Sequence, residues 1–229
     1  MESTRWLYAV LSGALLVGTF AFISFGVPPA QIEAGAWAQK IFYFHVSSAM
    51  ISFGLFFGGM LAGVGWLAWK EPRMSWASRS MVEIGWFVST LVLLTGPIWA
   101  RPVWGKYWNW EPRLTSFAFL WFAYAAYLLV GPAVEDRDKR RSLQAVYATL
   151  AFLSVPIVIY STRFVPVSNQ LHPPRIDMTP RMAAAWGLAL VALSLFFLGV
   201  VYLRYQVEAL TDTIADLKAR RLEGSPARG

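Results

Sequence analysis

Cysteine is absent from this chain of 229 residues, and histidine occurs only twice. The missing cysteine excludes disulfides, thiolate metal sites and thiol-based redox chemistry. No G-x-x-x-x-G-K-[ST] phosphate loop occurs either, so any ATP hydrolysis linked to this protein must come from another chain. Charged residues make up 14% of the chain, whereas soluble domains carry roughly 25%. These shortages argue against a soluble enzyme and against a cysteine-based metal protein.

Hydrophobic residues, in contrast, make up 57% of the sequence, and the mean hydropathy is +0.47. They gather in six apolar runs, each reaching the roughly 20 residues that cross a bilayer as a helix. The runs lie at about 6–25, 41–69, 81–100, 114–134, 143–162 and 181–204. Strand-like alternation is missing, so the predicted fold is an all-α integral membrane protein, a six-helix transmembrane bundle. No small-residue cleavage site follows the first run, which is therefore expected to be a retained span and not a removed signal peptide.

Lysine and arginine are distributed unequally between the two sides of this predicted bundle. With a cytoplasmic N-terminus, the inner segments hold 13 of the 20 basic residues and the outer segments hold seven. The positive-inside rule therefore predicts that both termini are cytoplasmic. This topology accounts for the net charge of +7, so the lipid bilayer is an expected partner and nucleic acid is not.

Residues 1–205 are expected to form one membrane domain, and residues 206–229 a cytoplasmic amphipathic tail. In the tail, apolar residues recur at steps of three and four, the spacing of one helix face. These residues are Val207, Leu210, Ile214 and Leu217. Two interpretations remain open: the tail continues the sixth span and contacts a partner subunit, or it lies on the membrane surface.

Some unusual residues inside the spans are predicted to belong to the scaffold. Small residues four apart in the second span, Gly54 with Gly58 and Gly59 with Gly63, are expected to let helices approach closely. Pro97 and Pro156 are expected to kink the third and fifth spans. Glu83, near the inner end of the third span, is expected to form an interfacial ion pair with Arg79, which argues against a proton-coupled transporter.

The densest aromatic cluster lies in the outer loop after the third span, in WGKYWNWEPRLTS at 104–116. Trp104, Tyr107, Trp108 and Trp110 crowd this single connection. Tryptophan and tyrosine also gather at membrane interfaces in ordinary membrane proteins, so an interfacial belt is one interpretation. A belt needs only one or two rings at each helix end, and the excess here favours a binding role.

Both histidines are predicted to lie on this outer side: His45 opens the second span, and His172 lies in the third outer loop, in SNQLHPPRID. A lone histidine at a helix end is commonly a solvated or capping residue, but two that flank an aromatic loop favour a shared ligand. Zinc usually takes three or four protein ligands, and neither cysteine nor a third histidine is available. Haem iron accepts one axial histidine on each side of a planar macrocycle and fits the pattern better. Arg101, Lys106 and Arg113 flank the cluster and could pair with haem propionates.

These segments resemble the CcmC family of haem-handling membrane proteins of cytochrome c maturation, also called the haem exporter protein C family. WGKYWNWEPRLTS is similar to the tryptophan-rich signature of that family, and IFYFHV at 41–46 and NQLH at 169–172 are similar to its two histidine segments. The resemblance runs to about residue 205 and includes six spans with both termini inside. It implies that His45 and His172 are the axial ligands of haem b. The implied haem platform consists of Trp104, Gly105, Tyr107, Trp108, Trp110, Glu111, Arg113 and Leu114.

The resemblance also implies a function and a location. Haem would be bound at the outer, periplasmic face of a bacterial cytoplasmic membrane and delivered to the haem chaperone CcmE for c-type cytochrome biogenesis. The implied partners, besides haem and that chaperone, are the ABC-type transporter subunits CcmA and CcmB and the small subunit CcmD. No separate acid, base or nucleophile set marks the chain as an enzyme.

The chain departs from the family pattern at several positions. Glu111 stands where the family has aspartate, Tyr107 replaces the first of the usual paired tryptophans, and Ser47 replaces a common proline. The tryptophans that usually precede the second histidine are absent from FVPVSNQLH, so this departure concerns the surroundings of His172.

Two other function classes remain open. A haem-bearing membrane anchor subunit of a respiratory complex would be expected to place its histidines deeper in facing helices, and His172 in the loop LHPPRI argues against this. A permease or structural subunit with an ordinary aromatic belt would bind no haem.

Overall fold

The computed structural model describes residues 2–28, 37–164, 166, 171–172 and 178–223. These residues form α-helices, two short helical turns of other kinds and loops, with no strand among them. The elements are α1 (Glu2–Ala21), η1 (Phe22–Gly26), α2 (Gln39–Trp69), α3 (Pro72–Trp104), α4 (Pro112–Val130), α5 (Arg137–Phe152), α6 (Ser154–Tyr160), η2 (Ser161–Phe164) and α7 (Pro180–Glu223). Six helical segments are long and apolar enough to cross a membrane, which confirms the predicted all-α, six-span fold.

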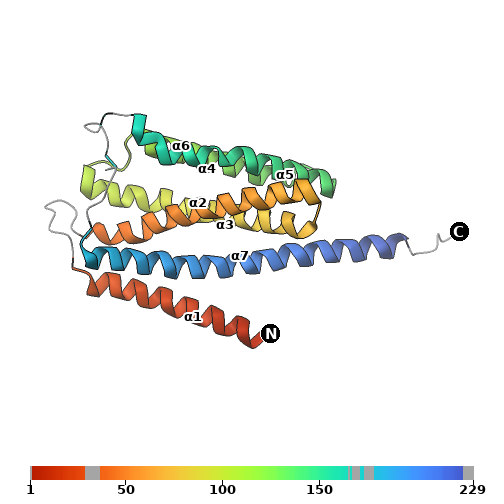
Figure 1. The fold of residues 1–229 in the computed structure, drawn as a ribbon, viewed down its shortest axis with the longest axis horizontal. Coiled ribbons are helices and arrows are strands. Elements are labelled where there is room, and N and C mark those ends of the chain that lie inside the picture. Colours follow the sequence, from red (N-terminus) through yellow and green to blue (C-terminus); the bar gives the residue numbers. More distant parts are fainter. Residues whose placement is uncertain (1, 29–36, 165, 167–170, 173–177, 224–229) are drawn as a thin grey trace.

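The helices lie side by side with both chain ends at the same end of the bundle (Figure 1). α1 begins and α7 ends toward the right of the view, whereas the end of α1, the start of α2, the end of α3, the start of α4 and the start of α7 lie together on the left. The left end therefore carries all three predicted outer connections. We call it the outer end, and the opposite end the inner end.

A glycine and a proline set the two helix boundaries that flank the aromatic loop. α3 ends at Gly105, which has a left-handed φ of 74° and donates its backbone N–H to the carbonyl of Arg101 over 3.0 Å. Glycine adopts this conformation without steric cost. α4 begins at Pro112, whose fixed φ and missing N–H suit the first helical position. The aromatic loop is thus a short connection fixed at both ends.

The fifth span is divided into α5 and α6. α5 ends at Phe152, and Leu153 donates its N–H to the carbonyl of Leu150, a tighter pattern than an α-helix. Pro156 lies just beyond and cannot donate to the Phe152 carbonyl, which its ring would also crowd. The fifth span is thus interrupted just before Pro156, whereas α3 runs from Pro72 to Trp104 as one helix with Pro97 inside it.

Glycines allow α2 to pack closely against its neighbours. A Cβ at Gly59 would lie 2.7 Å from Val82 of α3, and one at Gly63 would lie 3.3 Å from the backbone of Ala145 in α5. Phe56 of α2 stacks on Tyr124 of α4 with ring centroids 3.6 Å apart. The predicted packing role is therefore confirmed for Gly59 and Gly63, whereas a Cβ at Gly54 would meet nothing within 4 Å. α2 forms the centre of the bundle.

Glu83 takes part in a larger ion network than the predicted pair. Its carboxylate accepts from Arg79 over 2.8 Å and from Arg204 of α7 over 2.5 Å. Arg79 also contacts Glu208 of α7 over 3.3 Å, and Arg204 pairs with the same residue. These four groups connect α3 to α7 near the inner end.

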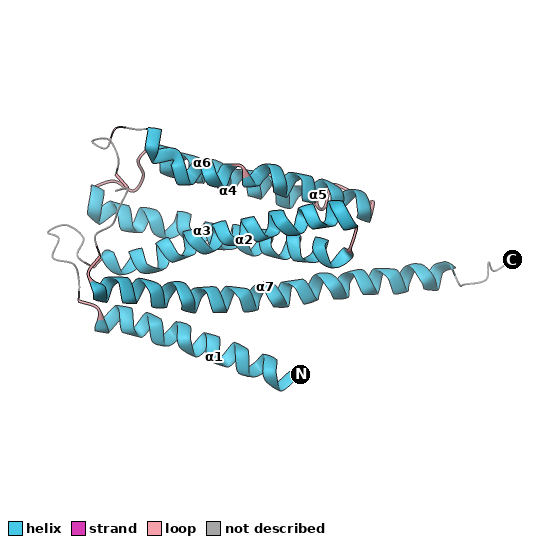
Figure 2. Cartoon of the chain, viewed as in Figure 1, coloured by secondary structure: helices cyan, strands magenta, loops and turns pink. Residues whose placement is uncertain are grey.

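α7 is 44 residues long, about 66 Å at 1.5 Å per residue, and it extends past the other helices (Figure 2). The predicted tail therefore continues the sixth span as one helix. Its acidic residues at four-residue steps, Glu208, Asp212 and Asp216, pair with arginines of α3, α5 and α7. The apolar stripe is exposed, at 52% for Val207, 60% for Leu210, 52% for Ile214 and 61% for Leu217.

Candidate ligand site at the outer end

His45 lies in the second turn of α2, half-buried against α3. Its Nδ1 is 2.9 Å from Oγ1 of Thr95. The Thr95 hydroxyl donates its single proton to the Leu91 carbonyl over 2.7 Å, so it can only accept from the imidazole. His45 therefore carries its proton on Nδ1 and keeps a free lone pair on Nε2.

Gly96, the residue after Thr95, allows this contact. A Cβ at Gly96 would lie 3.2 Å from Cε1 of His45, closer than most side chains approach. The ring edge of His45 thus packs directly on the backbone of α3. This contact and the Thr95 hydrogen bond fix the ring from two sides.

His172 is oriented by a carboxylate from the aromatic loop. Its Nδ1 contacts Oε1 of Glu111, and the backbone N–H of Leu171 donates to Oε2 of the same carboxylate over 3.0 Å. Glu111 is 7% exposed and precedes the first turn of α4. Burial opposes its charge, but the hydrogen bond from His172 and the nearby positive charges hold the pKa of Glu111 below its usual value. A carboxylate only accepts, so Nδ1 of His172 carries a proton, and the neutral form of the ring keeps its Nε2 lone pair for a ligand.

Aromatic rings connect the two histidine environments. Trp99, one turn after Thr95, meets Trp104 edge to face with centroids 4.9 Å apart. Trp104 in turn meets the ring of His172 edge to face at 5.2 Å.

The rest of the aromatic loop is more open. Trp108 and Trp110 meet edge to face at 5.8 Å, and the indole N–H of Trp108 is buried without a partner among the described residues. Tyr107 is 64% exposed and Trp110 is 80% exposed. The loop therefore presents ring surface outward, next to an unused indole donor.

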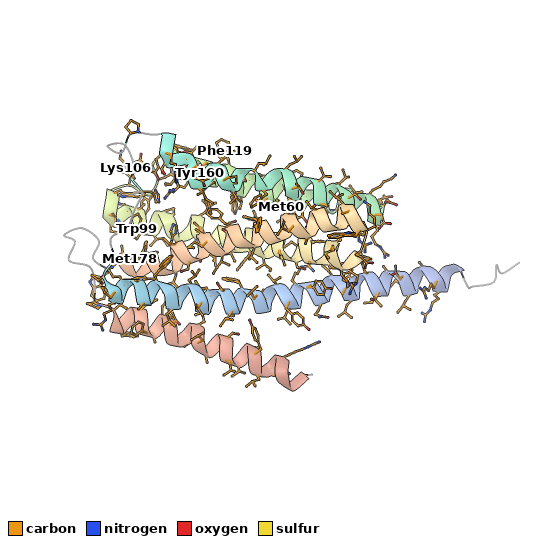
Figure 3. All side chains as sticks on the ribbon, in the orientation of Figure 1. Met60, Trp99, Lys106, Phe119, Tyr160 and Met178 are labelled. Atoms are coloured by element: carbon orange, nitrogen blue, oxygen red, sulfur yellow. The ribbon has the colours of Figure 1, made fainter. Side chains whose placement is uncertain are left out.

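The three predicted propionate partners differ in their surroundings. Arg101 donates to the Gly105 carbonyl and lies over the Tyr107 ring at 5.6 Å. Arg113 is half-buried and donates to Oγ1 of Thr162 over 3.2 Å. Lys106 is exposed, and it lies at the outer end with Trp99 and Met178 (Figure 3).

The predicted site residues thus gather at one end of the bundle, with Leu114 in the first turn of α4. Of the segment NQLH, only Leu171 and His172 are among the described residues. Sequence reasoning missed Thr95, Gly96 and Trp99. The only signal was a Thr-Gly pair in the apolar run LVLLTGP, which is common in spans that bind nothing.

This arrangement suits a ligand that binds between two imidazoles. Within the described residues, no group of three or more His, Cys, Asp or Glu side chains could hold a metal ion by itself. Two imidazoles from different segments, each with Nδ1 next to a protein oxygen, are the pair for which axial ligation of a haem iron was predicted.

Known proteins match the chain over most of its length. The CcmC family, described as heme exporter protein C, matches residues 1–221. Proteins named heme exporter protein C include one from Bradyrhizobium diazoefficiens, 31% identical over 74% of this chain and 62% of its own length. The one from Paracoccus denitrificans is 28% identical over 92% of this chain and 89% of its own length. The one from Escherichia coli K12 is 29% identical over 72% of this chain and 68% of its own length. With the six-span fold and the paired histidines already in place, the match over residues 1–221 shows that this chain belongs to the CcmC (heme exporter protein C) family.

Proposed function

We propose that this protein binds haem at the outer end of the bundle, with His45 and His172 as axial ligands, and passes it on for c-type cytochrome maturation. One observation carries the proposal: each imidazole uses Nδ1 for a protein acceptor and keeps Nε2 for a ligand. The names of the relatives from Paracoccus denitrificans and Escherichia coli support a role in haem export. Because the chain has no cysteine, it cannot form a thioether to haem, and we propose haem b as the cargo.

The aromatic loop supplies the surface on which the macrocycle lies. Trp104 lies against His172, and the exposed rings of Tyr107 and Trp110 leave one edge of the site open. An open edge suits a protein that must release its cargo, because a fully enclosed haem could not leave. Arg101, Lys106 and Arg113 are the cations for the two propionates.

The chain acts with partners in this proposal. The recipient is the membrane-tethered haem chaperone CcmE, and ATP hydrolysis comes from an ABC-type transporter of CcmA and CcmB with the small subunit CcmD. The protein lies in the bacterial cytoplasmic membrane with its haem site on the periplasmic face. It binds and presents haem, and no bond-making step is assigned to its own side chains.

The visible absorption spectrum of the detergent-purified protein tests the ligand assignment. We expect the wild type to carry haem with two nitrogen ligands. A double variant, His45→Gly with His172→Gly, is expected to lose the haem or change its ligation, and added imidazole is expected to restore the wild-type spectrum by filling the vacated ligand positions.

The matched control is Thr149→Val in α5, a substitution inside a span and away from the outer end. It should leave the spectrum unchanged. An unchanged spectrum in the double-histidine variant, or a wild type that takes up no haem when haem is supplied, would contradict the proposal and favour an ordinary aromatic belt.

A further inference from the structure

The two histidines use hydrogen-bond acceptors of different charge. Nδ1 of His45 donates to the neutral hydroxyl of Thr95, whereas Nδ1 of His172 donates to the carboxylate of Glu111. The Thr95 contact has a fixed direction because its hydroxyl proton is used by the Leu91 carbonyl. Both rings are therefore the same tautomer, but they are polarised to different degrees.

The charge of the acceptor changes how strongly an imidazole donates to a metal. A carboxylate on the far nitrogen draws the proton toward itself and makes the near nitrogen a stronger donor. A neutral hydroxyl orients the ring without this additional electron donation. His172 is thus the stronger prospective ligand and His45 the weaker one.

The surroundings of the two acceptors maintain this difference. Glu111 is nearly fully buried and accepts a second bond from the Leu171 backbone, so the carboxylate is fixed under His172. On the other side, the described contacts of the His45 ring are the Thr95 hydroxyl and the close approach of Gly96. No acidic side chain is described within hydrogen-bonding distance of His45.

We propose that Thr95 is a positioning residue that fixes the Nε2-donating tautomer of His45, and that the neutral acceptor makes His45 the weaker of the two haem ligands. On release, the bond from the iron to Nε2 of His45 breaks first, and a donor from the recipient takes that position while His172 still holds the haem. This inference rests on the proposed function, because it assigns unequal roles to the same two ligands.

Nitrogen-15 NMR of the haem-free protein tests the tautomers directly, since the chain has only two histidines. Both are expected to carry the proton on Nδ1. Thr95→Val keeps the side-chain shape and removes the acceptor, so the His45 signal should change to mixed tautomers while the His172 signal is unaffected. Thr95→Ser should restore the wild-type pattern. Thr149→Val, which also removes a hydroxyl bonded to a carbonyl four residues earlier, serves as the matched control.

Haem transfer to excess apomyoglobin tests the inequality. With His172→Gly only the weaker ligand remains, so release should be about tenfold faster or more than with His45→Gly. Adding Glu111→Gln to His45→Gly keeps an acceptor oxygen but removes its charge, and should bring the two release rates close together.

Three results would overturn the inference. They are equal or reversed release rates for the two single-histidine variants, no effect of Glu111→Gln, or a His45 tautomer that does not depend on Thr95. Each can occur while both histidines still bind haem, in which case the proposed function stands. Failure of the wild type to bind haem would instead remove the proposed function and the inference together.

Discussion

At the residue scale, the contacts of a single ring atom decide what each histidine can do. Nδ1 of His45 and Nδ1 of His172 both have protein partners, so each ring is oriented before any ligand arrives. Ordering the rings in advance lowers the entropic cost of binding. Substitutions of the residues that contact these rings are therefore expected to affect ligand binding as well.

Gly96→Ala is expected to weaken ligation by His45. The new Cβ would lie 3.2 Å from Cε1 of the imidazole, so the ring must shift by a few tenths of an ångström. We expect an altered visible spectrum and faster haem loss without a loss of stability, because alanine favours helix. Gly54→Ala is the control, since a Cβ there meets nothing within 4 Å. Equal effects of the two substitutions would contradict this role for Gly96.

Trp104→Leu is expected to remove a ring contact that orients the imidazole of His172. The indole contacts both Trp99 and His172 edge to face, and such ring contacts are worth about 0.5–1.5 kcal/mol. Haem retention should fall about threefold to tenfold. Trp69→Leu at the inner end, where the ring is 68% exposed, is the comparison and should retain haem normally.

At the element scale, helix ends determine where the aromatic loop begins and stops. α3 ends in the left-handed Gly105, and α4 begins at Pro112 directly after Glu111. Glu111 is therefore fixed to the start of a helix, and so is the carboxylate that orients His172. Changes at these helix ends should act on the site without contacting a ligand.

Gly105→Ala tests this dependence. Nothing lies within 4 Å of the added Cβ, so the cost is backbone strain at φ 74°, about 1 kcal/mol. We expect a lower melting temperature in detergent and weaker haem retention, because the end of α3 and Trp104 shift. Gly13→Ala, also without neighbours within 4 Å, should change neither property.

The spans could be predicted from hydropathy because a bilayer demands about 20 apolar residues in helix. The predicted run 41–69 agrees closely with α2, Gln39–Trp69, whereas the run 81–100 missed the beginning of α3 at Pro72. The first turns of α3 are polar and pair with α7 at the inner end, so hydropathy carries no signal for them. The same limit applies to α7, which continues to Glu223, well past the predicted run.

The site could be predicted only in part, for a related reason. Topology alone places His45, His172 and the aromatic loop at one end, because alternate loops share a side. The contact of Thr95 with His45 depends on how α2 and α3 are rotated against each other, which side-chain packing decides. Glu111 was predicted as part of the platform, but its contact with His172 depends on the pairing of two loops 61 residues apart.

At the scale of the whole molecule, charge pairs connect the inner ends of the helices. Glu83 accepts from Arg79 and Arg204, so one carboxylate links α3 to α7. These side chains are each less than one-third exposed, so removing one partner leaves the charge of the other partly buried and uncompensated. The network holds α7 at the inner end of the bundle, far from the candidate site at the outer end.

Glu83→Gln is therefore expected to lower the free energy of unfolding by roughly 1 kcal/mol for each ion pair that it weakens. The melting temperature in detergent should fall, while the visible spectrum of bound haem stays unchanged, because the site lies at the opposite end. Glu71→Gln is the control, since Glu71 and Arg73 form a largely exposed pair at 3.5 Å. A spectral change in Glu83→Gln would show that the two ends of the bundle are coupled.

The pairing of α1 with α7 has a consequence for biogenesis. Tyr8 of α1 donates its hydroxyl to the Leu195 carbonyl, and its ring would touch a Cβ at Gly199. α1 thus packs mainly on α7, although the two helices lie far apart in the sequence. During synthesis α1 enters the lipid before α7 has been made, so it lacks its main neighbour. The inner arginines of α3 and α5 likewise have no acidic partners until α7 follows. Completion of α7 is therefore the event that joins α1 to the helices packed around α2, and a chain that stops before α7 leaves a face of α1 and the inner arginines of α3 and α5 without their partners.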